Sequence, residues 1–212
     1  MRGTRAYVRI ATALASLAAL LGVAFAAPPP VLAAPERPAD IHERLAPSKT
    51  RPCRNIAKAR CGSIEVPLNP LNPTGKKIKI AYELYPRRNR TQPTQGTIVA
   101  VEGGPGYSTT DSRSYYRELF RPLLDSRRLL LVDNRGTGRS DAIHCPRLQS
   151  YTGNYVKAVG ACGRSLKNAS DLYGSGNAAD DLAAVLDHLE IERIDLYGDS
   201  YGTFFSQTSR KS

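Results

Sequence analysis

The pentapeptide Gly198-Asp199-Ser200-Tyr201-Gly202 decides the fold expected for this chain. An apolar run at residues 194–197 leads into it, and Thr203-Phe204-Phe205 begins a predicted helix. A serine between a strand and a helix occupies strained backbone, and side chains at the two glycine positions would crowd the turn. Such a turn exposes the serine hydroxyl beside an N–H group that can stabilise an oxyanion. The pattern therefore predicts a nucleophilic Ser200; a serine with only a structural role in the turn is the alternative.

Two further glycine-rich segments follow predicted buried strands. The continuously apolar run 97–101 ends in Glu102-Gly103-Gly104-Pro105-Gly106, and the run 129–132 ends in the segment 133–140. Neither segment has the Gly-Lys-Ser/Thr of a phosphate loop or the spacing of a dinucleotide site. Ligand sites on parallel sheets lie outside the carboxyl ends of the strands. We therefore expect both segments and the Ser200 turn to converge on one edge of a sheet.

Strands and helices alternate along the rest of the chain. Helices are predicted at residues 112–125 and after a cap at Asn177, the second with an apolar stripe at helical spacing. The stripe consists of Leu182, Val185, Leu186 and Leu189. This alternation predicts an α/β fold with a mostly parallel sheet and flanking helices. His188 ends the second helix, where a solvated histidine is usual, so we predict no catalytic role for it.

Other segments are read from their periodicity. Residues 63–66 and 78–85 alternate polar and apolar side chains, which predicts strands; the second is expected to be antiparallel and half-exposed. The segment 67–75 is rich in Pro, Asn and Gly and predicts a turn. Residues 141–173 show no clear period and are expected to be irregular.

The N-terminal segment has the pattern of an export signal. Arg2, Arg5 and Arg9 precede an apolar run at residues 10–27, and small residues follow. We predict a signal peptide at 1–34 and a lead-in linker at 35–52. An uncleaved membrane anchor is the alternative, disfavoured because three prolines at residues 28–30 interrupt the apolar run. The protein is therefore expected to be exported to the cell envelope or secreted, with only transient membrane contact.

Four cysteines fit an oxidising compartment. They lie in two close pairs, and although three connectivities are possible, we expect the disulfides Cys53–Cys61 and Cys145–Cys162. Zinc binding is the competing explanation, but the chain has no C-x-x-C and no suitably spaced histidine. No metal and no organic cofactor are predicted.

Length and charge narrow the class of protein. The 212 residues are enough for one domain with extensions, or for part of a larger domain. Hydrophobic residues make up 41% and charged residues 23%, which is ordinary globular composition. The net charge of +11 is spread along the chain, with no basic run longer than Arg87-Arg88-Asn89-Arg90. We therefore expect no nucleic-acid partner.

Taken together, the three glycine-bearing motifs resemble those of the α/β-hydrolases, and among them exported serine peptidases of the proline iminopeptidase and tripeptidyl aminopeptidase type. The similarity extends from about residue 53 to residue 207. It implies Ser200 as the nucleophile, with the N–H groups of Tyr201 and Gly104 as the oxyanion hole. It also implies structural roles for Asp133 and Arg135. The expected substrate is a peptide, or a small ester or amide, and the expected reaction is cleavage near a peptide N-terminus.

Two departures from the family pattern stand out. Glu102 replaces the usual His or Asn before the Gly-Gly-Pro-Gly loop; its carboxylate can bind a substrate ammonium or hydrogen-bond the loop. The family's catalytic acid and base follow the serine in chain order, but His42, His144 and His188 all precede Ser200 and no acid follows it. We therefore expect residues 53–212 to be the N-terminal part of such a domain, inactive alone, with the C-terminal strands and cap missing.

Two alternatives to a peptidase remain open at this point. One is a secreted domain that keeps the fold for binding without catalysis, and the other is an esterase or lipase. A further expectation follows from the missing strands: residues 194–197 form an exposed apolar edge that is prone to aggregation.

Overall fold

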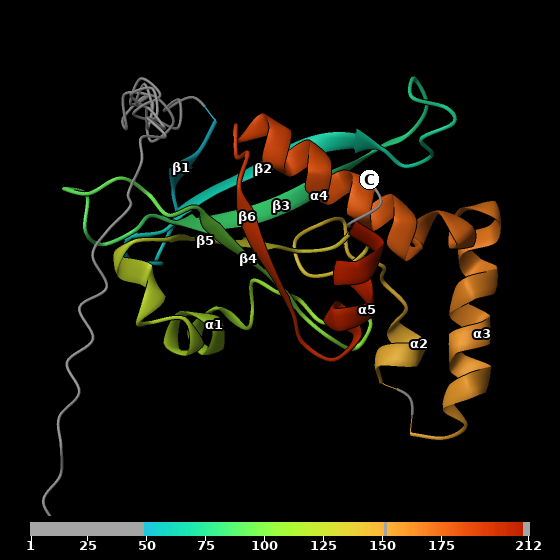
Figure 1. The fold of residues 1–212 in the computed structure, drawn as a ribbon. Coiled ribbons are helices and arrows are strands. Elements are labelled where there is room, and N and C mark those ends of the chain that lie inside the picture. The colour runs from blue at the N-terminus through green and yellow to red at the C-terminus, as the bar shows by residue number, and fades with distance from the viewer. Residues whose placement is uncertain (1–48, 151, 210–212) are drawn as a thin grey trace, which may run out of the picture. The chain divides into compact units, whose positions relative to one another are not determined.

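The structure, a computed structural model, describes residues 49–150 and 152–209. A six-stranded sheet with the order β1-β2-β3-β5-β4-β6 forms its centre (Figure 1). The strands are β1 (Arg51–Pro52), β2 (Arg60–Pro67), β3 (Lys77–Tyr85), β4 (Thr97–Val101), β5 (Arg128–Val132) and β6 (Ile194–Gly198). The predicted signal peptide, residues 35–48 of the predicted lead-in and His42 lie outside the described residues. The last two residues of that lead-in form β1, which pairs with β2.

The described sheet is mixed, and the connections explain why. Strands β1, β2 and β3 follow one another through short turns and pair antiparallel. β4 pairs parallel with both β5 and β6, and each of these connections contains helices. Short turns suit antiparallel neighbours, whereas parallel neighbours need a long crossover. The α/β class with flanking helices is confirmed.

Helices cover both faces of the sheet. They are α1 (Arg113–Leu119), α2 (Pro146–Gln149), α3 (Tyr155–Leu166), α4 (Ser175–His188) and α5 (Tyr201–Thr208), with 3-10 turns η1 (Leu123–Asp125) and η2 (Lys167–Tyr173). Val99 and Val101 of β4 join a core with residues of α4 and α5. Ile98 and Ala100 join a second core with Tyr116 of α1. Because strand side chains alternate between faces, β4 anchors both layers.

β3 is more buried than its alternating sequence predicts. Lys77 and Lys79 are exposed, as expected, but every residue from Ile80 to Tyr85 is buried. β3 lies inside the sheet between β2 and β5. The half-exposed prediction is therefore wrong for this half of the strand, because the sheet order and the helices on both faces cover it.

The segment 141–173, expected to be irregular, is largely helical. It contains α2, α3 and η2. Asn154 caps α3, and its side-chain oxygen accepts a hydrogen bond from the Lys157 N–H at 3.1 Å. The cap is readable in sequence, but Gly160 and Gly163 inside the helix weaken the helical pattern.

Two other helix boundaries differ from expectation. α4 begins at Ser175 with Gly174 as its cap, so Asn177 lies inside the helix, where its amide donates to the Leu172 carbonyl at 3.0 Å. The helix predicted at 112–125 divides into α1 and η1, with Pro122 between them. Proline lacks the N–H that would continue the helical ladder.

Both predicted disulfides are present. Cys53 is bonded to Cys61, and Cys145 to Cys162. The first holds the turn between β1 and β2, and the second joins the loop before α2 to α3. None of the helices in the described ranges is long and apolar enough to span a membrane.

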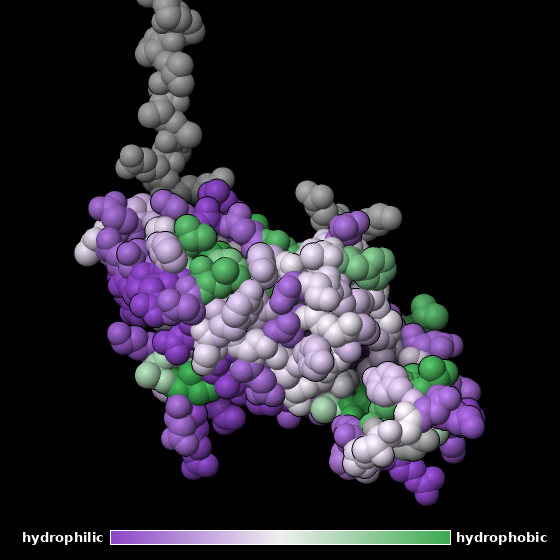
Figure 2. Space-filling model, turned by 90° about the horizontal axis from the view of Figure 1, so that it is seen from below, coloured by the Kyte–Doolittle hydropathy of each residue, from purple (hydrophilic) through white to green (hydrophobic). Residues whose placement is uncertain are grey.

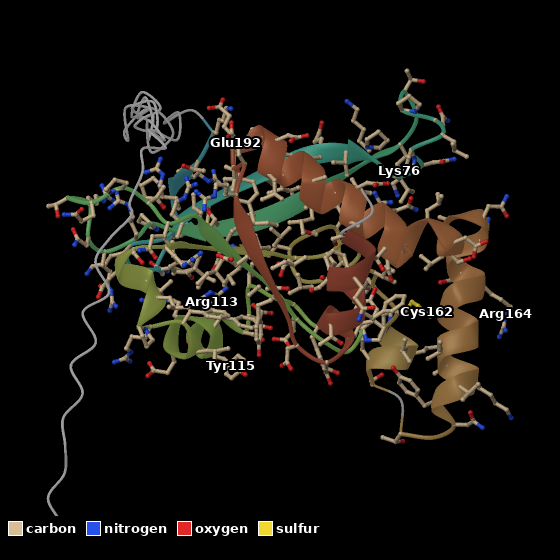
Figure 3. All side chains as sticks on the ribbon, viewed as in Figure 1. Lys76, Arg113, Tyr115, Cys162, Arg164 and Glu192 are labelled. Carbon is tan, nitrogen blue, oxygen red and sulfur yellow. A yellow bond between two sulfur atoms is a disulfide. The ribbon has the colours of Figure 1, made fainter. Side chains whose placement is uncertain are left out.

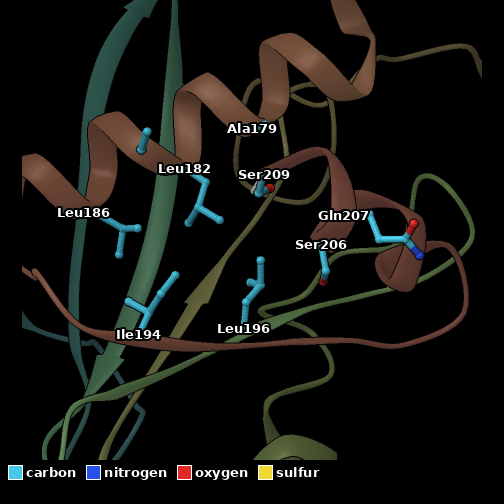
Figure 4. A pocket seen from close by; sticks show the side chains of 9 residues that line it. Ala179, Leu182, Leu186, Ile194, Leu196, Ser206, Gln207 and Ser209 are labelled. Atoms are coloured by element: carbon cyan, nitrogen blue, oxygen red, sulfur yellow. The ribbon is translucent and has the colours of Figure 1, made fainter. Parts of the chain in front are cut away.

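β6 forms one edge of the described sheet. It pairs with β4 only, and Ile194 is 36% exposed. Beside it lies a groove of about 570 Å³ between β6, α4 and α5, into which Leu182, Leu186 and Leu196 project (Figure 4). The structure therefore places apolar side chains along an open strand edge, the arrangement that favours edge-to-edge association.

Replacing Ile194 with lysine is expected to reduce aggregation of the 212-residue chain, because a charged side chain on an edge strand opposes pairing with another chain. Light scattering of the purified chain at increasing concentration measures this. Ile191→Lys is the matched control: Ile191 is only 6% exposed, so this lysine should destabilise the fold and increase scattering. Unchanged scattering in Ile194→Lys would show that β6 is not the associating edge.

Candidate active site

Ser200 occupies a strained turn between β6 and α5. Its backbone has φ 49° and ψ −115°, and the residue is exposed. The Asp199 N–H donates to the Val101 carbonyl at 3.0 Å, which ties the turn to the end of β4. The Thr203 N–H and hydroxyl both donate to the Ser200 carbonyl, at 3.0 and 2.7 Å. A positive φ at a non-glycine residue is costly, so the surrounding bonds must hold this conformation.

The two flanking glycines are required by close backbone contacts. A Cβ at position 198 would lie 2.0 Å from the Gly202 carbonyl oxygen, and a Cβ at 202 would lie 2.4 Å from the Val101 carbonyl oxygen. Backbone atoms cannot move aside as a flexible side chain can. The crowding that the Gly-x-Ser-x-Gly pattern predicts is present in the structure.

The Gly103–Gly106 loop touches Ser200. A Cβ on Gly103 would lie 2.8 Å from the Ser200 Cβ and 3.4 Å from its Oγ. Gly104, predicted to donate its N–H to the oxyanion, is the next residue and has φ +107°. Within the described part of the chain, neither the Gly104 N–H nor the Tyr201 N–H donates a hydrogen bond. Both N–H groups are therefore free to donate to an oxygen atom of a ligand. The contact between Gly103 and Ser200 was not predicted from the sequence.

The third loop is tied to the segment after β4 through Asp133, whose side chain is fully buried. Its carboxylate accepts hydrogen bonds from the Thr110 N–H at 2.9 Å, the Thr110 hydroxyl at 2.8 Å, the Ser108 hydroxyl at 3.0 Å and the Arg139 N–H at 2.9 Å. These bonds connect the loop after β5 to the segment after β4. In Figure 1 the β6–α5 turn lies beside the loops that follow these strands.

Arg135 forms no hydrogen bond with Ser200 and instead connects the loop after β5 to α4 and to two other segments. Its guanidinium donates two hydrogen bonds of 2.7 Å to Asp181 of α4. It also donates to the carbonyls of Leu68 and Leu172, at 2.9 and 2.7 Å. These contacts are those of a structural residue.

Two acidic residues follow β4 and β6 at the end of the sheet where Ser200 lies. Glu102 Oε1 accepts a hydrogen bond from the Gly103 N–H at 2.9 Å, and Asp199 directly precedes the serine. Burial raises the pKa of the Tyr116 hydroxyl, and the negative charges of Glu102 and Asp199 raise it further. Sequence reasoning singled out Glu102 but missed Asp199 and Tyr116, because no motif marks a tyrosine 84 positions before the serine.

No described histidine lies within hydrogen-bond distance of Ser200, where a general base would have to be. His188 ends α4, where its ring lies 6.2 Å from that of Tyr82, and His144 lies in the loop before α2. Neither contacts the serine in the described residues. The described ranges also contain no cluster of three or more His, Cys, Asp or Glu residues that could hold a metal.

The surface around α1 is polar overall. Figure 2 views the molecule from below and shows hydrophilic and intermediate residues over most of this face, with hydrophobic residues in small separate groups. Arg113 lies on the side of α1 that faces the sheet (Figure 3) and donates to both oxygens of the buried Glu83, at 3.0 and 3.1 Å. This ion pair fixes the position of α1 beside the loops.

Several solved structures are similar to this chain over part of their length. A proline iminopeptidase-related protein from Thermus thermophilus is 18% identical, with 72% of this chain and 40% of that chain covered and a TM-score of 0.41. The proline iminopeptidase of Mycobacterium smegmatis is 19% identical, with 70% and 38% covered and a TM-score of 0.44. An epoxide hydrolase from an endophytic Streptomyces is 18% identical, with 74% and 34% covered and a TM-score of 0.45.

The chain thus spans 34% to 40% of the length of these three structures. No curated protein matches it significantly. The family model described as the alpha/beta hydrolase fold matches residues 96–208, more than half of the chain, and includes all three loops. The chain therefore belongs to the α/β-hydrolase fold family.

Proposed function

We propose that this chain is the nucleophile-bearing part of an exported serine hydrolase that cleaves peptides near their N-termini through an acyl-enzyme on Ser200. One observation carries the proposal: Ser200 is exposed at φ 49° between β6 and α5, against the Gly103–Gly106 loop. Strain of this kind is concentrated at functional sites.

In the proposed reaction the Ser200 hydroxyl oxygen attacks the scissile carbonyl carbon. A new C–O bond forms, and the carbonyl oxygen takes up negative charge that the N–H groups of Tyr201 and Gly104 can stabilise. A base removes the hydroxyl proton and returns it to the departing amine. Water then hydrolyses the ester. We propose that the base and its acid partner come from outside the described residues, because no described histidine contacts Ser200 and a serine without a base is a weak nucleophile.

The surroundings of Ser200 support a peptide substrate over a lipid or a simple ester. The carboxylates of Glu102 and Asp199 attract a positively charged group, and the amino terminus of a peptide supplies one. The polar surface in Figure 2 shows no extended hydrophobic area that would suit a lipid aggregate.

We also propose that the protein is exported. The two disulfides support this, because such bonds persist mainly in oxidising compartments. Mass spectrometry of the protein from producing cells tests it: the first residue should lie between positions 27 and 35. A protein recovered intact from Met1 in the cell interior would contradict export.

A serine-directed fluorophosphonate probe tests the role of Ser200 in the complete gene product. We expect the probe to label the peptide that contains Ser200, and Ser200→Ala to lose all labelling. Ser206→Ala is the matched control: Ser206 lies on α5, further along the chain than Ser200, and its hydroxyl donates to the Gly202 carbonyl at 2.8 Å. It should keep its labelling. Labelling that survives Ser200→Ala would refute the proposal.

A further inference from the structure

Cationic side chains gather around two adjoining grooves between the turn after β1, the loop after β3 and α1. The first groove has a volume of about 560 Å³, and the second, of about 430 Å³, shares Lys58, Pro86 and Arg88 with it. We call the two together the basic groove. Side-chain nitrogen atoms are concentrated at this end of the sheet, around β1 and the loop that follows β3 (Figure 3). The cations of the first part are Lys58, Arg60, Arg87, Arg88 and Arg90, and the second part adds Arg117 and Arg121.

Neighbouring acids balance only part of this positive charge. Arg88 pairs with Asp125 at 2.8 Å, and Arg121 pairs with Glu118. Like charges held close together raise the free energy of the folded state, and an anion bound between them lowers it. The exposed cations of the groove that form no ion pair with any described residue are Lys58, Arg90 and Arg117.

The floor of the basic groove is apolar. Ile56, Ala59 and Pro86 line the first part, and Tyr85 and Leu124 line the second. Ala59 and Tyr85 are buried and belong to the core that packs against α1. Because this floor lies between cations, a ligand that fills the groove must offer apolar groups as well as negative charge.

The basic groove lies at the opposite end of the sheet from Ser200. Tyr85, at the end of β3, pairs with Leu129 near the start of β5, because the two strands are antiparallel. β4, β5 and β6 are parallel, so the groove lies where these three strands begin. Ser200 follows the end of β6. The groove is therefore separate from the candidate active site, and the proposed cleavage reaction does not account for it.

We propose that the basic groove binds an extended acidic segment of a partner protein. Arginine forms paired hydrogen bonds with carboxylates, which aspartate and glutamate side chains supply. Apolar side chains between those acids would cover the floor. A flat membrane surface would meet the exposed cations at the rim and leave the floor uncovered. Single-stranded nucleic acid stacks its bases on accessible aromatic rings, but Tyr85, the aromatic residue that lines the groove, is buried.

The test measures peptide binding to the complete gene product by fluorescence anisotropy. One labelled dodecapeptide alternates glutamate with leucine, and its control alternates glutamine with leucine. We expect the glutamate peptide to bind at least about 10-fold more tightly than the glutamine peptide. Its affinity should fall as salt is added, because salt screens exposed charges.

A triple variant tests whether the groove is the binding site. Replacing Lys58, Arg90 and Arg117 together with glutamine should weaken binding of the glutamate peptide by about 10-fold, because each exposed charge contributes a little and three are lost. All three side chains are exposed, so the urea midpoint should stay close to that of the wild type.

The matched control removes three positive charges elsewhere. Lys76→Gln, Lys157→Gln and Arg164→Gln are combined, because these exposed residues line neither part of the groove. Figure 3 shows Lys76 and Arg164 far from β1 and α1. This variant should keep the affinity of the wild type for the glutamate peptide.

Several outcomes would overturn the proposal. Equal affinity for the glutamate and glutamine peptides would do so, and equal losses in the two triple variants would show that net charge acts without the groove. Tighter binding of phosphatidylglycerol vesicles or of oligothymidylate than of the glutamate peptide would exclude an acidic segment as the ligand. Fluorophosphonate labelling of Ser200 should be the same in both triple variants. A loss of labelling in the groove variant alone would contradict a site separate from the nucleophile.

Discussion

Replacing Gly202 with alanine is expected to abolish fluorophosphonate labelling of Ser200 and to lower the free energy of unfolding by about 3 kcal/mol. The new Cβ would lie 2.4 Å from the Val101 carbonyl oxygen and 3.2 Å from the carbonyl carbon. To relieve this clash, α5 must move away from the end of β4. That movement carries the Tyr201 N–H and the Ser200 hydroxyl away from the Gly103–Gly106 loop, so the site is lost together with the stability.

Gly163→Ala is the matched control for this substitution. Gly163 lies inside α3, and a Cβ there would meet no atom within 4 Å. Because alanine favours the helix more than glycine does, this variant should gain about 0.5–1 kcal/mol and keep its labelling. Urea unfolding and probe labelling measure both variants. A Gly202→Ala protein that is labelled as fast as the wild type would show that the turn tolerates a side chain, and our account of the glycine would be wrong.

Asp181→Ala is expected to lower the free energy of unfolding by about 3–5 kcal/mol, since it leaves a buried arginine without its partner. The Arg135 side chain is 1% exposed and the Asp181 side chain 5%. Burial raises the pKa of Asp181, whereas Arg135 acts to lower it, so the carboxylate depends on the arginine for its charge. The pair joins the loop after β5 to α4, and its loss should loosen the packing of α4 on the sheet.

The neighbouring acid provides the control. Asp180 lies on the same helix but is exposed and has no ion pair within the described residues, so Asp180→Ala should change stability by less than about 0.5 kcal/mol. The double variant Arg135→Met with Asp181→Leu should lose less than the sum of the single variants, because it removes both charges. Equal urea midpoints for Asp181→Ala and Asp180→Ala would contradict the structural role of the pair.

The sequence predicted the site best where the chemistry is local. At Gly198 and Gly202 the backbone contacts leave no room for a Cβ atom, so only glycine fits there. The Gly-x-Ser-x-Gly motif therefore predicts the turn directly. The buried strands β4 and β5 were also predicted well, because a strand covered on both faces must be apolar throughout. Prediction was weakest in α3, because two glycines inside it lower the helix propensity of the segment.

The sequence by itself determined the strained turn at Ser200, the glycine-bearing loops and the α/β class, because each depends on residues close together in the chain. Only the tertiary structure decided that Gly103 touches Ser200 and that Glu102 and Asp199 leave the sheet side by side. These relations depend on the register of β4 with β6 and on the packing of α1. The register pairs residues 97 positions apart, α1 packs on strands that it does not adjoin in the chain, and no local pattern records either relation.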